Sequence, residues 1–263
     1  MELPADPPHP PRLSACVIAF NEEDRIGDCI RSLACCDEVL VVDSHSTDRT
    51  REIAASLGAR VIERDWPGYV AQKELAVRSA GADWVLCIDA DERLSPALQA
   101  ELVALRDAGF SGADGWEIPR LTWYLGSWIR HGTWYPDRAV RLFDRRRGKW
   151  VGHAAYALHE HVVLDSAPGR LRHDLFHYPY RTLEDHLRTI DQYTTIMAQG
   201  LHQHGRSAHA RDFVLRPFFA FVRFYWLKRG CLDGWRGLLL ASLHAHYTRM
   251  KYAKLFVLTR TND

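Results

Sequence analysis

Four short apolar runs in the first third of the chain constrain the fold most strongly. They cover residues 13–20 (LSACVIAF), 38–43 (EVLVVD), 60–63 (RVIE) and 83–89 (DWVLCID). Each run has the length of a strand, and the segments between the runs carry helical patterns. Continuous apolar strands that alternate with helices are typical of a parallel sheet covered on both faces. We therefore predict a Rossmann-like α/β layer over residues 13–108.

Local signals predict where the helices between these strands begin and end. Asn21 is expected to cap the first helix, and Gly58 stands where the residue after a helix end belongs. A further helix is expected over residues 69–80. Ser95, with Pro96 at the first helical position, is expected to start the next.

Polar side chains follow three of the predicted strands, at the point where each strand ends. They are Asn21, Asp43, and Asp89 with Asp91. In open α/β sheets ligands bind outside the carboxyl ends of the strands, so we expect these groups to converge on one crevice. The Asp43 carboxylate is then free to accept hydrogen bonds from a ribose or base. Residues 46–48 offer the simpler role of capping the next helix.

The segment Asp89-Ala90-Asp91 is the sharpest chemical signal. Residues i and i+2 of an extended segment face the same way, so two carboxylates there can share one divalent cation. Oxygen ligands at the mouth of a parallel sheet suit Mg²⁺ or Mn²⁺ that bridges a substrate diphosphate. The alternative is a solvated strand end before a helix.

The second half of the chain has a different pattern. Residues 116–180 consist of short, aromatic, β-prone pieces broken by Gly, Pro and Arg, which favours a mixed sheet with long loops. Thr182 is expected to begin a helix. Residues 208–258 are expected to form two or three helices around Gly230 and Gly234.

Charge is distributed unevenly along the 263 residues. The net charge is +1, which gives no global field for gripping a nucleic-acid backbone. Residues 205–263 hold eleven Lys and Arg against three Asp, a net +8, and the rest of the chain carries −7. This basic, aromatic end is expected to associate with an anionic membrane surface. The alternative is a helical hairpin that packs on the rest of the protein or on a second copy.

Cysteine usage and the N-terminus predict a cytoplasmic protein. The six cysteines include no C-x-x-C pair and are expected to be reduced core residues. The Pro-rich start has neither the basic nor the apolar region of a signal peptide. The most apolar late stretch, residues 217–227, is too short to span a bilayer.

The order of these segments resembles inverting glycosyltransferase family 2, which has the GT-A fold. The pieces AFNEE, VVDSHSTDRT, WPGYVAQKELAV and DWVLCIDADE match that family over roughly residues 12–110. The later pieces WYPD, RLF, His159-Glu160 and HYPY resemble the bacterial lipopolysaccharide-core β-glucosyltransferase subgroup. The family usually has glycine where this chain has His45.

The resemblance implies a division of labour among the residues already noted. The nucleotide-sugar pocket would be lined by Ala19, Phe20, Glu22 and Ala90. Asp43 would read the base or ribose, and Lys73 would approach the nucleotide. Asp89 would touch the ribose or metal, and Asp91 would ligate Mg²⁺ or Mn²⁺ between the phosphates. A solvated helix lysine is the simpler role for Lys73. No glycine-rich phosphate loop is present, which agrees with a metal in that role.

An inverting transfer needs a base that removes the proton of the acceptor hydroxyl. Glu160 is our candidate because family members place an acidic base after the mixed region, and Asp137 and Asp165 are its rivals. His177 is a candidate metal ligand, with a packed histidine as the alternative. A zinc site is rejected, because the spacing of five histidines in this region fits no structural zinc motif. These histidines are His153, His159, His161, His173 and His177.

Two further groups are candidates for substrate binding. The arginines are expected to pair with nucleotide phosphates or with anionic groups of a lipid-linked acceptor; they are Arg138, Arg141, Arg145, Arg146 and Arg147. The tryptophans are expected either to stack on sugars or to pack in the core; they are Trp123, Trp128 and Trp134.

The sequence therefore predicts a GT-A glycosyltransferase that transfers a hexose, namely glucose, from a UDP-sugar. The acceptor would be a lipid-linked sugar such as the lipopolysaccharide inner core. The enzyme would work on the inner face of the cytoplasmic membrane. Alternatives are another nucleotide sugar and envelope glycan, a nucleotidyltransferase, or a non-catalytic sugar-nucleotide-binding protein. The expected domains are a disordered leader (1–11), a catalytic domain (12–204, with nucleotide half 12–110 and acceptor half 111–180) and a helical extension (205–263).

Overall fold

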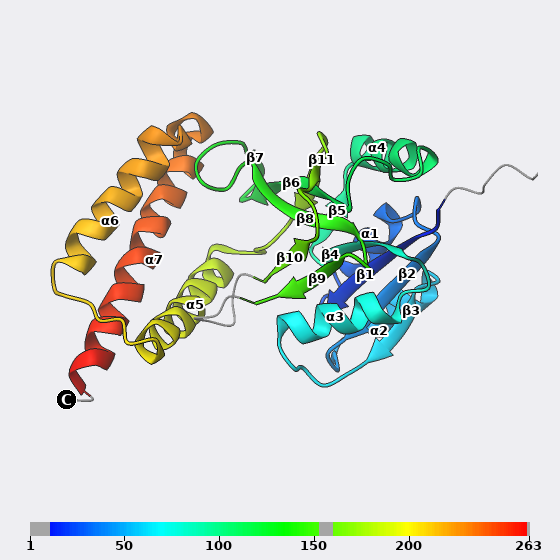
Figure 1. Ribbon diagram of the computed structural model, residues 1–263. Helices are drawn as coiled ribbons and strands as arrows, with labels where there is room; N and C mark the ends of the chain where they lie inside the picture. Colours follow the sequence, from blue (N-terminus) through cyan, green and yellow to red (C-terminus); the bar gives the residue numbers. More distant parts are fainter. Residues whose placement is uncertain (1–10, 153–159, 262–263) are drawn as a thin grey trace, which may run out of the picture.

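The computed structural model describes residues 11–152 and 160–261 (Figure 1). The first ten residues of the expected leader, together with His153 and His159, lie outside this part of the chain. The described strands are β1 (Leu13–Ala19), β2 (Glu38–Asp43), β3 (Arg60–Glu63), β4 (Trp84–Asp89), β5 (Glu92–Leu94), β6 (Gly115–Tyr124), β7 (Ser127–Ile129), β8 (Asp137–Asp144), β9 (Gly148–Val151), β10 (His161–Leu164), β11 (Gly169–Arg170) and β12 (Leu175–His177).

Helices occupy both the first half of the chain and its C-terminal end. They are α1 (Ile26–Ser32), α2 (Thr50–Ser56), α3 (Tyr69–Ser79), α4 (Pro96–Asp107), α5 (Leu183–Gln203), α6 (Asp212–Val222) and α7 (Gly234–Thr261). A π-helical turn (Arg223–Leu227) and a 3₁₀ turn (Gly230–Asp233) join α6 to α7.

Ten of the described strands form one sheet, along which the order is β3-β2-β1-β4-β8-β6-β12-β5. Strand β1 lies parallel between β2 and β4, and β3 extends the parallel part beyond β2. Strand β8 pairs antiparallel with both β4 and β6, and β12 is parallel to β6 but antiparallel to β5. This confirms both the parallel layer of the first half and the mixed sheet of the second.

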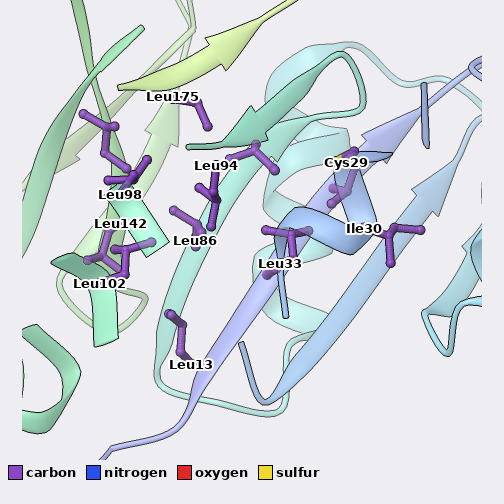
Figure 2. Close-up of a cluster of buried hydrophobic side chains, with 14 of the residues drawn as sticks. Leu13, Cys29, Ile30, Leu33, Leu86, Leu94, Leu98, Leu102, Leu142 and Leu175 are labelled. Carbon is purple, nitrogen blue, oxygen red and sulfur yellow. The ribbon is translucent and has the colours of Figure 1, made fainter. Parts of the chain in front are cut away.

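The apolar strands are buried because helices cover both faces of the sheet. On one face Cys29, Ile30 and Leu33 of α1 and Leu98 and Leu102 of α4 pack against the strands (Figure 2). On the other face, Ala76 and Val77 of α3 join a second cluster of buried side chains. All six cysteines of the chain lie in the described part and are free thiols, as expected.

Most predicted helix ends are confirmed. The Ser95 hydroxyl accepts a hydrogen bond from the Leu98 amide at the start of α4, and Gly58 has a φ of 84° just past α2. Thr182 forms a capping box with Asp185 at the start of α5. The prediction for Asn21 is wrong, because α1 begins only at Ile26. Asn21 instead has a φ of 54° and binds a neighbouring loop.

The C-terminal helices pack beside the mixed part of the sheet. Helix α7 lies against both α5 and α6, and α6 forms the outer layer (Figure 1). The α6–α7 connection is fastened to the segment after β7, where the Asp233 carboxylate accepts hydrogen bonds from the amides of Arg130 and His131. Phe224 is fully buried there and leaves no room for a side chain at Gly132. The C-terminal helices are thus anchored to the sheet through the turns that connect α6 to α7.

Within residues 11–152 and 160–261, none of the helices combines the length and the apolar character that crossing a bilayer requires.

Candidate active site

The carboxyl ends of β1, β2 and β4 lie side by side. In the sheet register Ala19 is opposite Asp43 and Ile18 is opposite Asp89. Asp91 follows in the turn between β4 and β5. The polar groups that the sequence placed at three strand ends therefore meet at one edge of the sheet, as parallel pairing requires.

The loops after β1 and β2 brace each other through side chains that bond backbone groups. The Asn21 amide donates to Ser46 Oγ at 2.9 Å, and the Thr47 amide donates to Asn21 Oδ1 at 2.8 Å. Farther along, the Glu22 amide donates to Thr50 Oγ1 at 2.8 Å. Three hydrogen bonds connect the two loops in this way, so the loops form one wall of the site.

Asp43 is part of this brace. Its side chain is fully buried, Oδ1 accepts the Ser46 amide at 2.8 Å, and Oδ2 accepts the Ser46 hydroxyl at 2.5 Å. The expectation of a carboxylate free for a ribose or base is not met, because Ser46 occupies both oxygens. His45, where the family usually has glycine, has a φ of 59°. This left-handed conformation costs a side-chain-bearing residue about 1 kcal/mol and explains why glycine suits the position.

A buried lysine lies at the centre of the site. Lys73 Nζ is 2.8 Å from Glu160 Oε1 and 3.0 Å from Asp89 Oδ1, and its side chain is only 5% exposed. It also lies 4.7 Å from the centre of the Trp150 ring. Burial alone would lower the pKa of Lys73, but the two carboxylates outweigh it and raise this pKa above its usual range. The solvated role considered for Lys73 is therefore wrong, and the lysine joins α3 to β4 and to the segment before β10.

Asp89 is held by two cations. Besides Lys73, Arg141 on β8 places its Nη2 atom 3.2 Å from Asp89 Oδ2. Burial would raise the pKa of Asp89, but the positive charges of Lys73 and Arg141 hold it well below its usual range. Asp89 is thus ionised at neutral pH.

A fully buried glutamate extends this network away from the site. Glu92 Oε1 accepts from Arg141 at 2.8 Å and from Arg120 at 3.2 Å, while Glu92 Oε2 accepts from the Asp89 amide at 3.0 Å. Arg120 in turn pairs with Asp137. The sequence reasoning missed Glu92, although it follows the two aspartates directly in the chain. Acidic and basic side chains thus alternate in this network. Their hydrogen bonds fix the position of Asp89 on the side away from the site.

Asp91 lies next to a histidine. Asp91 Oδ2 is 3.5 Å from His177 Nε2, and the Tyr178 amide donates to the Asp91 carbonyl at 2.9 Å. That Asp89 and Asp91 share one cation stays a prediction. Residues 90 and 91 form a turn instead of an extended segment, so the alternation that would align the two side chains does not apply.

Glu22 completes this side of the site. Burial raises the pKa of Glu22 to about 7, and the nearby charge of Asp91 adds to the rise, while Arg25 opposes it. Glu22 Oε2 is 3.4 Å from Arg25 and 3.3 Å from Arg181. A buried carboxylate with a raised pKa beside a second acidic side chain is an environment that a divalent cation would stabilise.

The described side chains of the site offer few donors for a metal ion. Among the described residues there is no group of three or more His, Cys, Asp or Glu side chains arranged to hold a cation. Asp91 and His177 supply two adjacent donors. This number fits a cation such as Mg²⁺, which proteins commonly hold through one or two carboxylates while substrate phosphates and water complete the shell.

The remaining predicted pocket residues lie along the strand ends. The Phe20 ring is 57% exposed beyond β1 and is free to contact a ligand. Ala19 and Ala90 are buried, so they offer mainly backbone groups. These positions agree with a pocket lined by the ends of β1 and β4.

The rivals of Glu160 are placed elsewhere. Asp137 is occupied by Arg120, and Asp165 is exposed beyond β10. Glu160 alone of the three contacts Lys73 and thereby Asp89. Two tyrosines that the sequence reasoning missed also face this cluster, since Tyr69 of α3 is hydrogen-bonded to Tyr193 of α5 and the charges of Glu160 and Asp89 act on both. Tyr69 precedes Lys73 by one helical turn, which is the one signal that could have revealed it.

The predicted arginine cluster is divided by the structure. Arg141 enters the site and Arg138 donates to the Leu171 carbonyl. The arginines after β8 pair with carboxylates at the opposite edge of the sheet; these are Arg145, Arg146 and Arg147. The expectation that this triplet meets the substrate is therefore wrong, because β8 runs antiparallel to β4 and ends where β4 begins.

The candidate tryptophans pack against other aromatic rings. Trp123 contacts Trp128, which stacks on Phe176 at 4.6 Å. Trp134 packs between Tyr124 and Tyr180. All three are half-buried.

Comparison with known proteins assigns the family. The model of glycosyl transferase family 2 matches residues 14–153, which is more than half of the chain. The chain belongs to glycosyl transferase family 2. The mixed sheet with helices on both faces is accordingly the GT-A fold predicted for this family member.

Relatives of this glycosyltransferase match over almost its whole length. The lipopolysaccharide core biosynthesis glycosyltransferase LpsC of Rhizobium meliloti (strain 1021) is 29% identical over 250 residues, which cover 93% of this chain and 92% of LpsC. An uncharacterized glycosyltransferase of Rickettsia typhi is 29% identical over 256 residues, or 93% and 86% of the two chains. The solved structure of residues 1–349 of S. aureus TarS has 17% identity and a TM-score of 0.47, and covers 96% of this chain and 92% of that one.

Proposed function

We propose that this family 2 enzyme is a metal-dependent, inverting glycosyltransferase. It transfers a hexose, namely glucose, from a UDP-sugar to a sugar hydroxyl of a lipid-linked glycan such as the lipopolysaccharide inner core. The observation that carries the proposal is the cluster in which Lys73 holds Glu160 and Asp89 beside the Asp91–His177 pair. The role of LpsC in core biosynthesis supports the choice of acceptor.

In this mechanism Glu160 is the base. As the acceptor oxygen attacks the anomeric carbon, a new C–O bond forms and the bond from that carbon to the diphosphate oxygen breaks. The electron pair of the broken bond leaves with UDP, and the hydroxyl proton passes to Glu160. Lys73 holds Glu160 in place before the attack.

Other residues bind the donor. Asp91 and His177 would hold Mg²⁺ or Mn²⁺, which neutralises the charge that develops on the departing diphosphate. Ala19, Phe20, Glu22 and Ala90 form the nucleotide-sugar pocket. Asp43 shapes the wall of this pocket through Ser46, and Asp89, fixed by two cations, is available to the ribose through the exposed edge of its side chain.

A binding screen followed by an activity assay tests this function. Thermal unfolding is measured with UDP-, GDP- and dTDP-sugars, each with and without Mn²⁺, because a specific ligand raises the unfolding temperature by mass action. We expect the largest rise with UDP-glucose and Mn²⁺, and slow release of UDP from that donor. Equal shifts for all three nucleotides, or tight binding without any UDP release, would favour another donor or a non-catalytic sugar-nucleotide-binding protein.

A further inference from the structure

Exposed apolar side chains are concentrated in the α6–α7 hairpin. Of the fifteen large apolar residues that are exposed in the described chain, nine lie between positions 214 and 238. Phe218, Phe219 and Leu227 are 62%, 63% and 74% exposed. Six of the nine define what we call the outer face of the hairpin, namely Val214, Leu215, Phe218, Phe219, Trp226 and Leu227.

The helix geometry explains why these residues share a side. Helix α6 packs on α7 and forms the layer farthest from the sheet (Figure 1). Within α6, Val214, Leu215, Phe218 and Phe219 lie three to four places apart, which is the spacing of one helix face. Pro217 and Phe224 are buried on the opposite side. The apolar stripe is therefore left uncovered by the described chain.

Basic side chains accompany this stripe. Arg211, Arg223, Lys228 and Arg229 are exposed along the same segment. Its acidic residues are already engaged, because Asp212 accepts from the His209 amide and pairs with Arg216, and Asp233 pairs with His131. The surface thus combines large apolar groups with uncompensated positive charge.

We propose that the outer face of the hairpin docks on an anionic lipid bilayer. Phe and Leu side chains enter the boundary between headgroups and acyl chains, Trp226 lies at headgroup level, and the Arg and Lys side chains meet lipid phosphates. A protein partner would not require this surplus of positive charge, whereas a bilayer rich in anionic lipid complements it. The inference deepens the proposed function, since an acceptor built on lipid must be reached at a bilayer surface.

The position of the hairpin also links this surface to the site. Leu240 and Ala241 of α7 form a buried cluster against which Tyr180 packs. Tyr180 follows Tyr178 by two residues, and the Tyr178 amide binds the Asp91 carbonyl. Docking through the hairpin therefore holds the site at a fixed height above the bilayer.

Vesicle sedimentation of the full chain tests the proposal. The probes are vesicles of pure phosphatidylcholine and vesicles of an equal mixture of phosphatidylcholine and phosphatidylglycerol. We expect binding to the anionic vesicles that weakens with added salt. The Phe218→Ser/Phe219→Ser variant should bind at least about tenfold more weakly, since two large apolar groups are lost from the contact. Arg223→Gln/Lys228→Gln should lose the preference for anionic vesicles.

A matched control and a second measurement keep the test decisive. Leu57→Ser/Val163→Ser removes exposed apolar groups from the sheet domain and should bind like the unchanged protein. Sedimentation velocity without lipid should show a monomer for both. Absence of vesicle binding, equal loss in the control variant, or a stable dimer that Phe218→Ser/Phe219→Ser dissolves would overturn the proposal.

A further measurement distinguishes failure of the proposed function from failure of the proposed membrane surface. Mn²⁺-dependent UDP-sugar binding by lipid-free protein should be unchanged in Phe218→Ser/Phe219→Ser. If no UDP-sugar binds while anionic vesicles still do, the surface stands and the proposed function falls; the reverse result removes the surface alone.

Discussion

The ammonium nitrogen of Lys73 lies 2.8 Å from Oε1 of Glu160, although 87 positions separate the two residues in the chain. The same nitrogen reaches Asp89 at 3.0 Å. Helix α3 thereby connects a strand end of the parallel layer with the candidate base that precedes β10. The geometry gives Lys73 two roles that experiments can separate, one in stability and one in transfer.

Removing the buried cation should destabilise the protein. Lys73→Met leaves two partly buried carboxylates without their partner, which we expect to lower the free energy of unfolding by about 3 kcal/mol. Urea denaturation followed by circular dichroism measures this change. Arg31→Met, which breaks an exposed pair with Asp28, should cost less than about 1 kcal/mol. A loss for Lys73→Met no larger than that of the control would contradict the central position of the lysine.

Glu160→Gln should separate catalysis from binding. The amide keeps the size of the side chain but cannot accept the acceptor proton, so we expect kcat to fall about 100-fold or more. The affinity for UDP, measured by calorimetry, should be nearly unchanged. The rival carboxylate serves as the control, because Asp165→Asn should retain the normal rate. The opposite ranking of the two variants would move the base to Asp165.

Cation binding should depend on the Asp91–His177 pair. With UDP present, added Mn²⁺ should raise the unfolding temperature of the unchanged protein, and Asp91→Asn and His177→Ala should each reduce that rise. A ligand at 100 times its Kd stabilises by roughly 2.7 kcal/mol, which thermal unfolding resolves. His173→Ala, whose ring pairs with Glu101, is the control. An undiminished Mn²⁺ effect in both site variants would exclude this pair as the cation ligands.

His186 should make stability depend on pH. Burial lowers the pKa of His186 to about 4, and the ring is hydrogen-bonded to the Tyr124 hydroxyl at 2.9 Å. The unfolded chain binds a proton near pH 6.5 and the folded chain does not, so this contribution is present above pH 6.5 and is lost as the pH falls towards 4. A shift of this size corresponds to roughly 3 kcal/mol.

The measurement is the free energy of unfolding at several pH values from 7.5 down to about 4, for which urea titrations suffice. His186→Gln should flatten the decrease in that interval, whereas substitution of the exposed His246 by Gln should leave it unchanged. Parallel curves for the unchanged protein and His186→Gln would show that other groups cause the decrease.

Local patterns sufficed to predict the layer that carries the site. Strand runs such as residues 38–43 are apolar throughout because both faces of the sheet are covered, and this property is visible in one dimension. Parallel pairing then brings Asp43 and Asp89 to the same edge without further information. Helix starts with a side-chain cap, at Ser95 and Thr182, were predicted for the same reason.

The contacts that assign each side chain its partner could not be predicted in this way. Whether Asp43 faces a ligand or a neighbouring serine depends on a positive φ at His45 and on how the loop folds back. The direction of β8 decides that Arg141 enters the site while Arg145 meets the opposite edge. Glu92 directly follows the two aspartates in the chain, but only the folded structure brings Arg120 and Arg141 around it.

The reciprocal bonds between the loops after β1 and β2 also bear on how this enzyme can diverge. Asn21 and Ser46 each bond a group of the other loop. Nearby, the Glu23 amide donates to Asp48 Oδ2 and the Arg49 amide donates to Glu23 Oε2. A change of length in one loop would leave hydrogen-bond donors of the other loop without partners. To change the preference for the sugar donor by grafting, both loops would therefore have to be transferred together, as a single cassette.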